Sequence, residues 1–335
     1  MTKRKILVCG GAGYIGSHMV QLLLEEGHDV VVFDNLSSGH EEAIKGAVLE
    51  RGDLLRPEDL EAVFARHKID AVIHFAALIA VGESVERPDL YYRNNVTGTL
   101  NLLDAMRKAG VERLVFSSTA AVFGNPQSEL IDETHPLGPI NPYGWSKRMV
   151  EQILADYATA FGLRSVALRY FNAAGAHPDG LIGEAHYPET HLVPLVLFTA
   201  MGIREKLSVF GSDYETRDGT CIRDYIHVLD LASAHLLALD YMDSHEGFHS
   251  FNLGNGNGFT NLEVIETAKR LTNNDIPYEM TARRAGDSAV LVADSSRAKS
   301  ELGWKPKFDD LETIIETAWR WHHDPKYGPF AGSKK

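Results

Sequence analysis

The N-terminal stretch reads Lys5-Ile6-Leu7-Val8-Cys9-Gly10-Gly11-Ala12-Gly13-Tyr14-Ile15-Gly16. Its apolar run predicts a buried strand, and the apolar residues at helical spacing that follow Gly13 predict a helix. The glycines between them let the backbone turn sharply and let a pyrophosphate approach the N–H groups at the helix N-terminus. Gly11, Gly13 and Gly16 fit the dinucleotide-binding fingerprint, while Gly10, Gly13 and Gly16 fit a wider spacing. Either spacing predicts a strand, a phosphate-binding turn and a helix.

A second apolar run, Asp29-Val30-Val31-Val32-Phe33, ends on Asp34. Dinucleotide-binding folds place an acid at about this distance from the glycines, where it accepts hydrogen bonds from the adenosine ribose. A carboxylate there repels a 2′-phosphate, so we predict NAD rather than NADP as the cofactor. A glycine-rich loop without a ligand is the competing interpretation, and the strand, the helix and the acid together disfavour it.

The alternation of strands and helices continues along the chain. Continuous apolar runs at 71–75, 113–116 and 165–170 predict strands that are buried on both faces. Helices are expected from Pro88 to Ala109 and from Pro142 to Phe161. This order is typical of an α/β fold with a Rossmann-type, doubly wound parallel sheet.

The composition changes near residue 175, where irregular segments rich in glycine and proline begin. We therefore expect two domains. Residues 1–174 are predicted to form the NAD-binding Rossmann domain, which residues of about 219–243 rejoin. Residues 175–218 and 244–330 are predicted to form a smaller C-terminal α/β domain that binds the substrate.

The formal net charge of −13 argues against a general nucleic-acid or anionic-membrane surface, because both need a basic face. The two cysteines, Cys9 and Cys221, form no disulfide framework and suit a reducing compartment. The first apolar run ends at Gly10, too early for a signal-peptide core, and the run Leu192–Met201 is interrupted by Pro194 and too short to span a bilayer. We expect a soluble, cytoplasmic protein that binds neither nucleic acid nor membrane.

The 15 histidines include His186, His191 and the adjacent pair His322 and His323. None stands in a zincin-type spacing or near clustered cysteines, the patterns that mark protein zinc sites. Surface or hydrogen-bonded roles are expected for these side chains, and no metal site is predicted.

Tyr143 and Lys147 stand four residues apart on the helix expected after Pro142, so their side chains share one face. A phenol with an ordinary pKa of about 10 is a poor base at neutral pH, but a nearby positive charge favours its phenolate. The preceding strand ends in Ser117-Ser118-Thr119, and parallel sheets bind ligands at the carboxyl ends of their strands. Such a pair is ordinarily interpreted as a packed ring and a solvated amine. Next to the hydroxyl residues of this strand end, the pair instead predicts a general base at Tyr143.

Together these motifs resemble the extended short-chain dehydrogenase/reductase family and, within it, the UDP-glucose 4-epimerases. The resemblance runs almost end to end. It rests on Asp34-Asn35, Val81-Gly82-Glu83-Ser84, Asn94-Asn95-Val96-Thr97-Gly98-Thr99, Ser117-Ser118-Thr119-Ala120, Asn141-Pro142-Tyr143-Gly144, Arg169-Tyr170-Phe171-Asn172, Gly175-Ala176-His177-Pro178, Arg223-Asp224-Tyr225-Ile226-His227-Val228 and Asn252-Leu253-Gly254.

The resemblance implies an isomerase of galactose metabolism that interconverts UDP-glucose and UDP-galactose. In that mechanism Tyr143 takes the proton of the sugar 4-hydroxyl while hydride passes from C4 to tightly bound NAD. Thr119 hydrogen-bonds the same oxygen, and Lys147 holds the cofactor ribose and lowers the pKa of Tyr143. The resulting 4-keto sugar turns over and takes the hydride back on its other face. A homodimer is also implied.

The family's binding residues map onto this chain position by position. Cofactor contacts fall on Gly10, Gly13, Tyr14, Ile15, Gly16, Asp34, Asn35, Asp53, Leu54, Phe75, Ala76, Ala77, Asn94, Ser117, Tyr143, Lys147 and Tyr170. Substrate contacts fall on Thr119, Tyr143, Asn172, Phe210, Arg223, Arg284, Asp287 and Leu291. The competing roles are a turn cap for Asn172, core packing for Phe210, a solvated loop acid for Asp287 and surface positions for the arginines.

Four residues depart from familiar members. Ile79 replaces a lysine that some epimerases carry, so a cofactor contact by that side chain is lost. Phe123 replaces the usual tyrosine, and Cys221 stands at a position that is often glycine. Leu291 stands where family members gate the space beside the sugar 2-substituent. Because leucine is smaller than the tyrosine found there, we expect some activity on UDP-N-acetylglucosamine and UDP-N-acetylgalactosamine; the alternative is that Leu291 only packs at the domain interface.

Two other functions remain on the same fold. A nucleotide-sugar 4,6-dehydratase would need an added acid-base pair after the hydroxyl residue, where this chain has Ala120 and Ala121. A catalytically silent NAD-sensing protein would not need Thr119, Tyr143 and Lys147 together.

Overall fold

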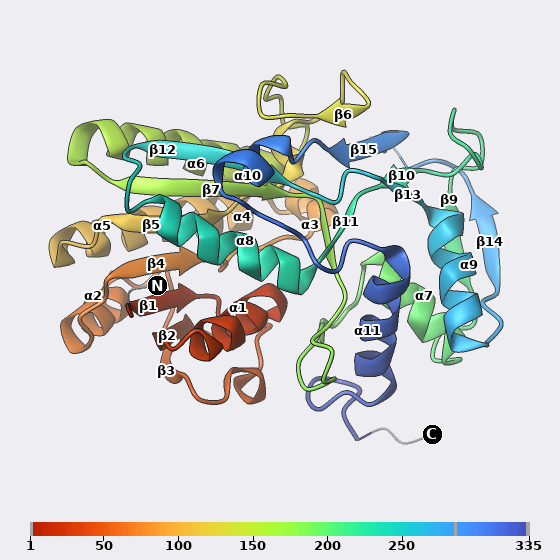
Figure 1. Cartoon of the computed structure of the whole chain (residues 1–335), viewed down its shortest axis with the longest axis horizontal. Helices are drawn as coiled ribbons and strands as arrows, with labels where there is room; N and C mark the ends of the chain where they lie inside the picture. The colour runs from red at the N-terminus through yellow and green to blue at the C-terminus, as the bar shows by residue number, and fades with distance from the viewer. Residues whose placement is uncertain (1–2, 285–286, 333–335) are drawn as a thin grey trace.

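The computed structural model describes residues 3–284 and 287–332. Figure 1 shows a large α/β unit that carries the N-terminus and, beside it, a smaller group of helices and short strands near the C-terminus. The two units share segments, because the chain passes between them several times.

A seven-stranded sheet forms the centre of the larger unit, in the order β12-β7-β5-β4-β1-β2-β3, and all of its pairs are parallel. Its strands are β1 (Lys5–Cys9), β2 (Asp29–Asp34), β3 (Val48–Arg51), β4 (Ala71–His74), β5 (Arg113–Ser117), β7 (Arg164–Tyr170) and β12 (Phe248–Leu253). The predicted Rossmann-type doubly wound sheet is confirmed. The carboxyl ends of these strands meet at one edge, where ligands of such sheets bind.

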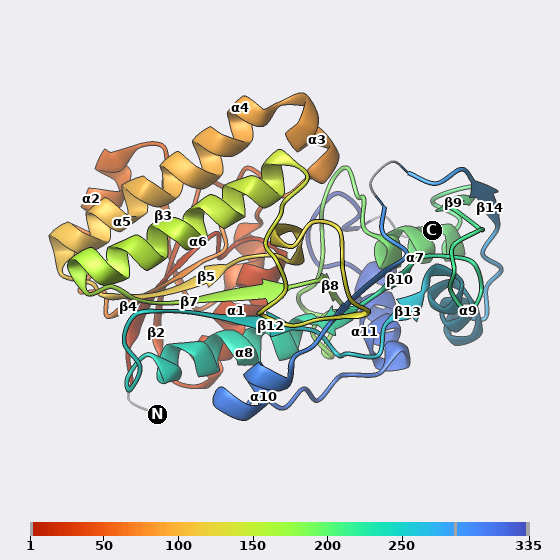
Figure 2. The same ribbon diagram turned by 90° about the horizontal axis from the view of Figure 1, so that it is seen from above.

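Helices cover both faces of this sheet, and each face has its own apolar core. On one face, α1 (Tyr14–Glu25) and α8 (Val228–Tyr241) pack together, with α10 (Ser296–Glu301) beside β12. On the other face lie α2 (Pro57–Arg66), α5 (Gly98–Ala109) and α6 (Pro142–Phe161). Figure 2 shows α5 and α6 on one side of the sheet and α8 on the other.

The helix expected from Pro88 to Ala109 is a composite. It begins as α4 (Pro88–Tyr91), widens into a π-helical turn at Tyr92–Thr97 and continues as α5, which ends at the left-handed Gly110. The π turn carries Asn95, whose amide bonds both backbone groups of Leu78 and the hydroxyl of Ser146. Such turns are rare inside helices and recur at functional sites.

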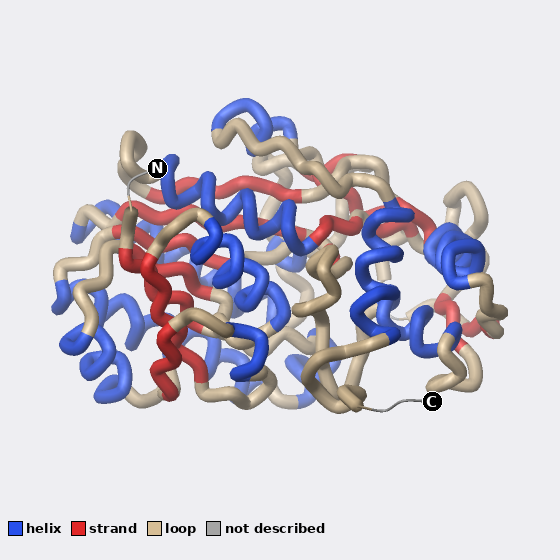
Figure 3. The backbone as a smooth tube through the Cα atoms, turned by 60° about the horizontal axis from the view of Figure 1, so that its bottom comes forward, coloured by secondary structure: helices blue, strands red, loops and turns tan. Residues whose placement is uncertain are grey.

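The smaller unit has a separate apolar core. Its helices are α7 (Leu192–Ala200), α9 (Asn261–Thr272) and α11 (Leu311–His323), and β9 (Leu207–Phe210) pairs with β14 (Tyr278–Thr281). A four-stranded sheet joins β13 (Phe259–Thr260), β10 (Ile222–Arg223), β15 (Val290–Ala293) and β6 (Leu130–Ile131), while β8 (Asn172–Ala174) pairs with β11 (Tyr225–His227). Figure 3 shows these helices grouped on the side where the C-terminus lies. One further helix, α3 (Val81–Glu86), precedes α4.

Two returning segments tie the units together. The helix α8, within the segment expected to rejoin the larger unit, packs against α1, whereas the strand before it pairs with β8 rather than with the large sheet. β12 also belongs to the large sheet, although it lies in the range assigned to the smaller domain. The chain therefore returns to the smaller unit only after β12. Among the described residues, no helix is both long enough and apolar enough to cross a membrane.

Candidate active site

Two glycines of the N-terminal turn are required by close backbone contacts. Gly10 has a φ of 77°, in the left-handed region, and a Cβ there would lie 2.5 Å from the backbone nitrogen of Ala76. A Cβ on Gly16 would lie 2.2 Å from the carbonyl oxygen of Gly10. Gly10 therefore permits the turn against the neighbouring strand end, and Gly16 lets α1 pack against the turn itself.

Gly13 has a different role. A Cβ there would meet only the carbonyl oxygen of Gly10, at 3.5 Å, so no packing requirement excludes a side chain. Gly13 is also the N-cap of α1, and no side chain caps this end of the helix. The helix N-terminus thus presents N–H groups and a positive dipole end without a side chain in front of them, as a phosphate site needs. A Cβ on Gly11 would also be too close to a neighbour, at 2.9 Å from the Val32 side chain, so both glycine spacings fit the turn.

Asp34 lies beside this turn, at the end of β2. Its carboxylate accepts hydrogen bonds from the backbone N–H of Ala12, at 3.0 Å, and of Leu36, at 2.8 Å. The carboxylate is therefore fixed next to the glycines with further lone pairs free for hydroxyl donors. Asn35 donates a 3.3 Å hydrogen bond to the carboxylate of Asp53. Leu54, the residue after Asp53, is buried.

The remaining expected cofactor contacts surround the same sheet edge. Phe75 and Ala76 follow β4, and their backbone N–H groups both bond to the carbonyl of Cys9, which sets Ala76 against Gly10. Asn94 lies in the π turn. The side chain of Tyr14 is committed elsewhere, because its hydroxyl donates to the carbonyl of Gly175 at 2.6 Å. Tyr14 is therefore available to a cofactor through its backbone N–H only.

A connected set of polar groups follows the end of β5. The amino group of Lys147 donates a 2.7 Å hydrogen bond to the carbonyl oxygen of Ser117, and the hydroxyls of Ser117 and Tyr170 are hydrogen-bonded to each other. Burial lowers the pKa of Lys147 to about 7, although the nearby Glu151 carboxylate favours its charged form. These side chains come from β5, α6 and β7, so the fold brings together residues that are far apart in the chain.

Tyr143 stands in the first turn of α6. The side chain of Asn141 caps this helix by accepting a 2.8 Å hydrogen bond from the N–H of Gly144, and this cap sets where the helix begins. Burial raises the pKa of the Tyr143 phenol, and its interaction with the Thr119 hydroxyl only partly offsets this effect. In the chain alone, therefore, Tyr143 is a neutral phenol beside Thr119, and its phenolate requires added positive charge.

A buried triad supports this site, and sequence reasoning did not identify it. Glu151 is fully buried; it accepts a 2.6 Å hydrogen bond from the Ser118 hydroxyl and a two-point contact from Arg169, at 2.9 and 2.8 Å. Paired and fully hydrogen-bonded, these charges hold the strand end beside α6 in one arrangement. The available signals were an arginine inside an apolar strand and an acid one turn after Lys147.

The expected substrate residues gather in a second place, a cavity of about 300 Å³ in the smaller unit. Asn172, Phe210, Arg223, Arg284 and Asp287 all line it. The guanidinium of Arg284 lies 3.7 Å from the centre of the Phe210 ring, and that of Arg223 lies 3.4 Å from the Asp287 carboxylate. Arg204 lines the cavity as well, so three arginines border it in an acidic protein, which suits an anionic ligand.

Asn172 lines this cavity and lies close in the chain to Tyr170, which belongs to the polar groups around Lys147. It follows Tyr170 by two residues, and its amide donates a 2.9 Å hydrogen bond to the carbonyl of Asp224. Leu291 is not among the cavity residues; it packs against a small buried cluster formed by Ala120, Val122, Phe123 and Ile131. Because Ala120 directly follows Thr119, Leu291 lies near Thr119.

The whole chain can be compared with known proteins. Residues 7–317 match the sequence model of the family described as GDP-mannose 4,6 dehydratase. A curated UDP-glucose 4-epimerase of Halalkalibacterium halodurans is 51% identical over 323 residues, which cover 96% of this chain and 97% of the relative. The chain belongs to the UDP-glucose 4-epimerase family.

Solved structures agree with this family. The UDP-glucose 4-epimerase of Brucella ovis in complex with NAD is 50% identical, with a TM-score of 0.92 over 94% of this chain and 97% of that one. The UDP-Glc/GlcNAc 4-epimerase of Campylobacter jejuni is 45% identical, with a TM-score of 0.84 over 95% of this chain and 98% of that one. The family model named for a dehydratase describes the shared fold, whereas the relatives at about half identity are epimerases.

Proposed function

We propose that the protein interconverts UDP-glucose and UDP-galactose by inverting C4 of the sugar, with NAD as a bound cofactor, and so acts in galactose metabolism. The observation that carries the proposal is the placement of Tyr143 beside Thr119, one helical turn from a Lys147 anchored to Ser117. The epimerase relatives support the same reaction.

The residues of the larger unit fit a dinucleotide. The open helix N-terminus at Gly13 suits the pyrophosphate, and the fixed Asp34 carboxylate suits the ribose hydroxyls of NAD. Ser117, Lys147 and Tyr170 would hold the other half of the cofactor at the sheet edge. When bound, NAD supplies reversible two-electron oxidation of C4 and a positive charge near Tyr143.

Tyr143 exchanges the proton of the 4-hydroxyl. Burial raises the pKa of the Tyr143 phenol in the chain alone. In the proposed mechanism, the positive charge that favours its phenolate comes from Lys147, one helical turn away, and from the cofactor. Tyr143 then accepts the proton as the sugar becomes a 4-ketone, and it returns the proton after the sugar has turned over. The Thr119 hydroxyl donates to the same sugar oxygen and keeps it in line with Tyr143.

The second cavity holds the nucleotide part of the substrate. Arg223 and Arg284 suit the diphosphate, while Asn172, the first residue of β8, would contact the sugar. Anchoring the substrate by this remote part leaves the hexose itself free to rotate between the two hydride-transfer orientations, which inversion at C4 requires.

Product analysis tests the function. UDP-glucose and UDP-galactose, each incubated with the purified protein and NAD, are expected to reach the same mixture. Tyr143→Phe is expected to retain UDP binding but to react about 10²- to 10⁴-fold more slowly. A 4-keto-6-deoxy product would instead indicate the dehydratase, against which Ala120 and Ala121 argue, and an inert protein that still binds NAD would indicate a sensor.

We further propose activity on UDP-N-acetylglucosamine and UDP-N-acetylgalactosamine. Leu291 stands next to the Ala120 turn and is only partly buried, so a smaller side chain than tyrosine borders the sugar region. The Campylobacter jejuni relative, by its name, acts on both sugar types. Leu291→Tyr is expected to reduce turnover of the acetylated sugars more than that of the hexoses; no detectable turnover of the acetylated sugars by the natural protein would refute this extension.

A cytoplasmic homodimer completes the proposal. Cys9 and Cys221 are buried free thiols, which suits a reducing compartment. The side chains of Val85 on α3 and Trp145 on α6 are 62% and 43% exposed, and these two helices pack side by side. An exposed apolar face of this kind suits a twofold contact between copies. Sedimentation velocity is expected to give a dimer that Trp145→Lys weakens.

A further inference from the structure

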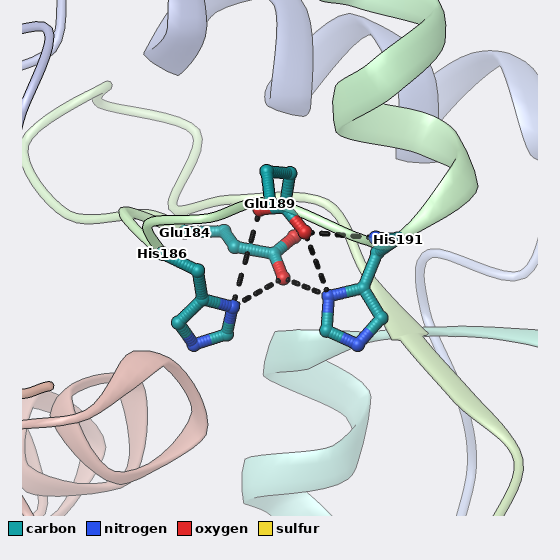
Figure 4. A group of neighbouring side chains, drawn as sticks. All are labelled: Glu184, His186, Glu189 and His191. Atoms are coloured by element: carbon teal, nitrogen blue, oxygen red, sulfur yellow. Dashed lines mark hydrogen bonds and ion pairs between the residues drawn. The ribbon is translucent and has the colours of Figure 1, made fainter. Parts of the chain in front are cut away.

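The loop before α7 contains two Glu-x-His pairs, Glu184-Ala185-His186 and Glu189-Thr190-His191. Their spacing matched no zinc motif, and no metal was expected. The fold nevertheless turns all four side chains toward one point, with one ligand atom from each lying within 4.8 Å of the others. Figure 4 shows both imidazole rings directed at the two carboxylates.

The separations between these atoms are those of a metal site. Nδ1 of His191 lies 2.7 Å from Oε1 of Glu184 and 3.1 Å from Oε1 of Glu189. Nδ1 of His186 lies 3.1 Å from Oε1 of Glu184 and 3.9 Å from Oε2 of Glu189. Tetrahedral zinc bonds of about 2.0–2.1 Å place neighbouring ligand atoms about 3.3 Å apart, within this range.

Hydrogen bonding leaves part of the cluster unsatisfied. The side chains of Glu184 and Glu189 are each only 4% exposed. Within the described part of the chain, Oε1 of Glu184, Oε2 of Glu189 and Nδ1 of His191 are buried without a partner in hydrogen-bonding geometry. The ion-pair contacts therefore leave these three atoms without a hydrogen bond. Buried polar atoms are rarely left so, and a cation at the point where they converge would satisfy all three.

Groups around the cluster fix the four side chains in place. Oε1 of Glu189 accepts hydrogen bonds from the N–H groups of Thr190 and His191, at 2.7 and 2.8 Å. The carbonyl of Glu184 accepts a 2.7 Å hydrogen bond from the Trp321 indole, and the Tyr14 ring packs edge-on against His186. Support of this kind orients metal ligands before the ion arrives.

We propose that Glu184, His186, Glu189 and His191 bind one Zn²⁺ ion. Two imidazoles favour zinc over calcium or magnesium, which prefer oxygen ligands, and two carboxylates balance the charge of a divalent ion. Four protein ligands close a tetrahedral site, so the ion is structural and takes no part in the reaction at Tyr143.

The position of the site gives the ion a role. Its surroundings include Tyr14 from α1, whose first turn follows the glycine loop, and Trp321 from α11 of the smaller unit. His191 immediately precedes α7 and also lines the cavity that holds Arg223 and Arg284. A bound ion therefore ties one wall of the substrate cavity to the helix that carries the dinucleotide turn.

Metal analysis of the NAD-bound protein tests the proposal directly. After incubation with Zn²⁺ and gel filtration, mass spectrometry of the metal is expected to find about one zinc per chain. Zn²⁺ added to chelator-treated protein is expected to raise the melting temperature by about 5 °C. Co²⁺ in its place is expected to give the strong visible absorption of a tetrahedral site, a signal that loosely bound surface ions do not produce.

Variants separate this cluster from nonspecific binding. Glu189→Gln, a small change that keeps the fold, and His191→Asn are expected to lose the zinc and the cobalt absorption. The matched control is the double variant His245→Gln with His249→Gln, which changes two histidines that contact each other in the other unit. It is expected to keep both the zinc and the cobalt absorption. Less than about 0.1 zinc per chain in the natural protein, or loss of the metal in the control but not in Glu189→Gln, overturns the proposal.

Discussion

The amino group of Lys147 donates a 2.7 Å hydrogen bond to the carbonyl oxygen of Ser117, the last residue of β5. This contact fixes Lys147 at the carboxyl edge of the sheet, one helical turn from Tyr143. Burial holds the pKa of Lys147 near 7, so its charge depends on what binds beside it. On the proposed function, the charge of this lysine favours the phenolate of Tyr143.

Lys147→Met is expected to slow the reaction about 10²- to 10⁴-fold, since the phenolate of Tyr143 loses its nearest cationic support. The acidic limb of the profile of kcat/KM against pH is expected to move to higher pH, a change that a purely structural role would not produce. Lys108→Met, at an exposed lysine paired with Glu61, is the matched control. An unshifted limb in Lys147→Met contradicts this role.

Gly16 and Gly13 are expected to respond differently to alanine. Gly16→Ala forces a methyl group to within 2.2 Å of the Gly10 carbonyl, so it should lower the free energy of unfolding by about 1–3 kcal/mol. Gly13→Ala meets no such contact and should cost less than about 1 kcal/mol, yet it should weaken NAD binding because its methyl group enters the space before α1. Denaturant unfolding and NAD titration measure the two effects; equal destabilisation with unchanged NAD affinity would sink this assignment.

Arg284→Ala is expected to raise KM for the UDP-sugar about 10- to 100-fold with little change in kcat, because a charge-assisted contact to the diphosphate is lost from both the ground and the transition state. Arg283→Ala is the matched control, since the Arg283 guanidinium instead pairs with Asp213 at 2.7 Å and stacks on Tyr214. Steady-state kinetics on both variants decide the point. A larger effect in Arg283→Ala would place the diphosphate elsewhere.

Acid is expected to destabilise the protein through histidines that are buried in the neutral form. Burial lowers the pKa to about 3 for His74 and His227 and to about 4 for His18, His235 and His322. Below the unfolded value of about 6.5, the unfolded chain binds protons that the folded chain does not, so stability falls as the pH falls and the loss is complete near pH 3–4.

Each such histidine should cost about 1.6 kcal/mol between pH 6.5 and pH 5. Denaturant unfolding at the two pH values measures the loss. His235→Leu removes one of these groups from α8 and is expected to reduce the difference by about that amount, whereas His245→Leu, at an exposed position, is expected to leave it unchanged. An equal pH dependence in His235→Leu and the natural protein argues against this source of acid sensitivity.

Local patterns predicted the strand, the turn and the helix around the expected dinucleotide site because these parts follow one another in the chain. The glycine turn joins β1 directly to α1, Asp34 ends β2, and Tyr143 and Lys147 lie one turn apart on α6. The buried pairing of Glu151 with Arg169 lies outside such patterns, since its partners meet only when α6 packs on β7.

The edge of the sheet and the loop before α7 were harder to predict. β12 lies at the sheet edge and carries polar residues such as His249 and Ser250, so it lacks the apolar run of a central strand. The Glu184 cluster depends on a loop conformation that no periodicity describes. The cavity that contains Arg223 and Arg284 joins distant segments, and only the family resemblance indicated these residues in advance.

The fate of the hydrogen on C4 distinguishes return of the hydride to C4 from exchange with water and from dehydration. UDP-galactose labelled with deuterium at C4 is to be converted in unlabelled water, and the product examined by NMR and mass spectrometry. If Tyr143 exchanges only the proton of the 4-hydroxyl and the hydride returns to the same sugar, the UDP-glucose formed is expected to retain deuterium at C4. Deuterium lost to water, or found at C6 of a dehydrated sugar, would contradict this expectation.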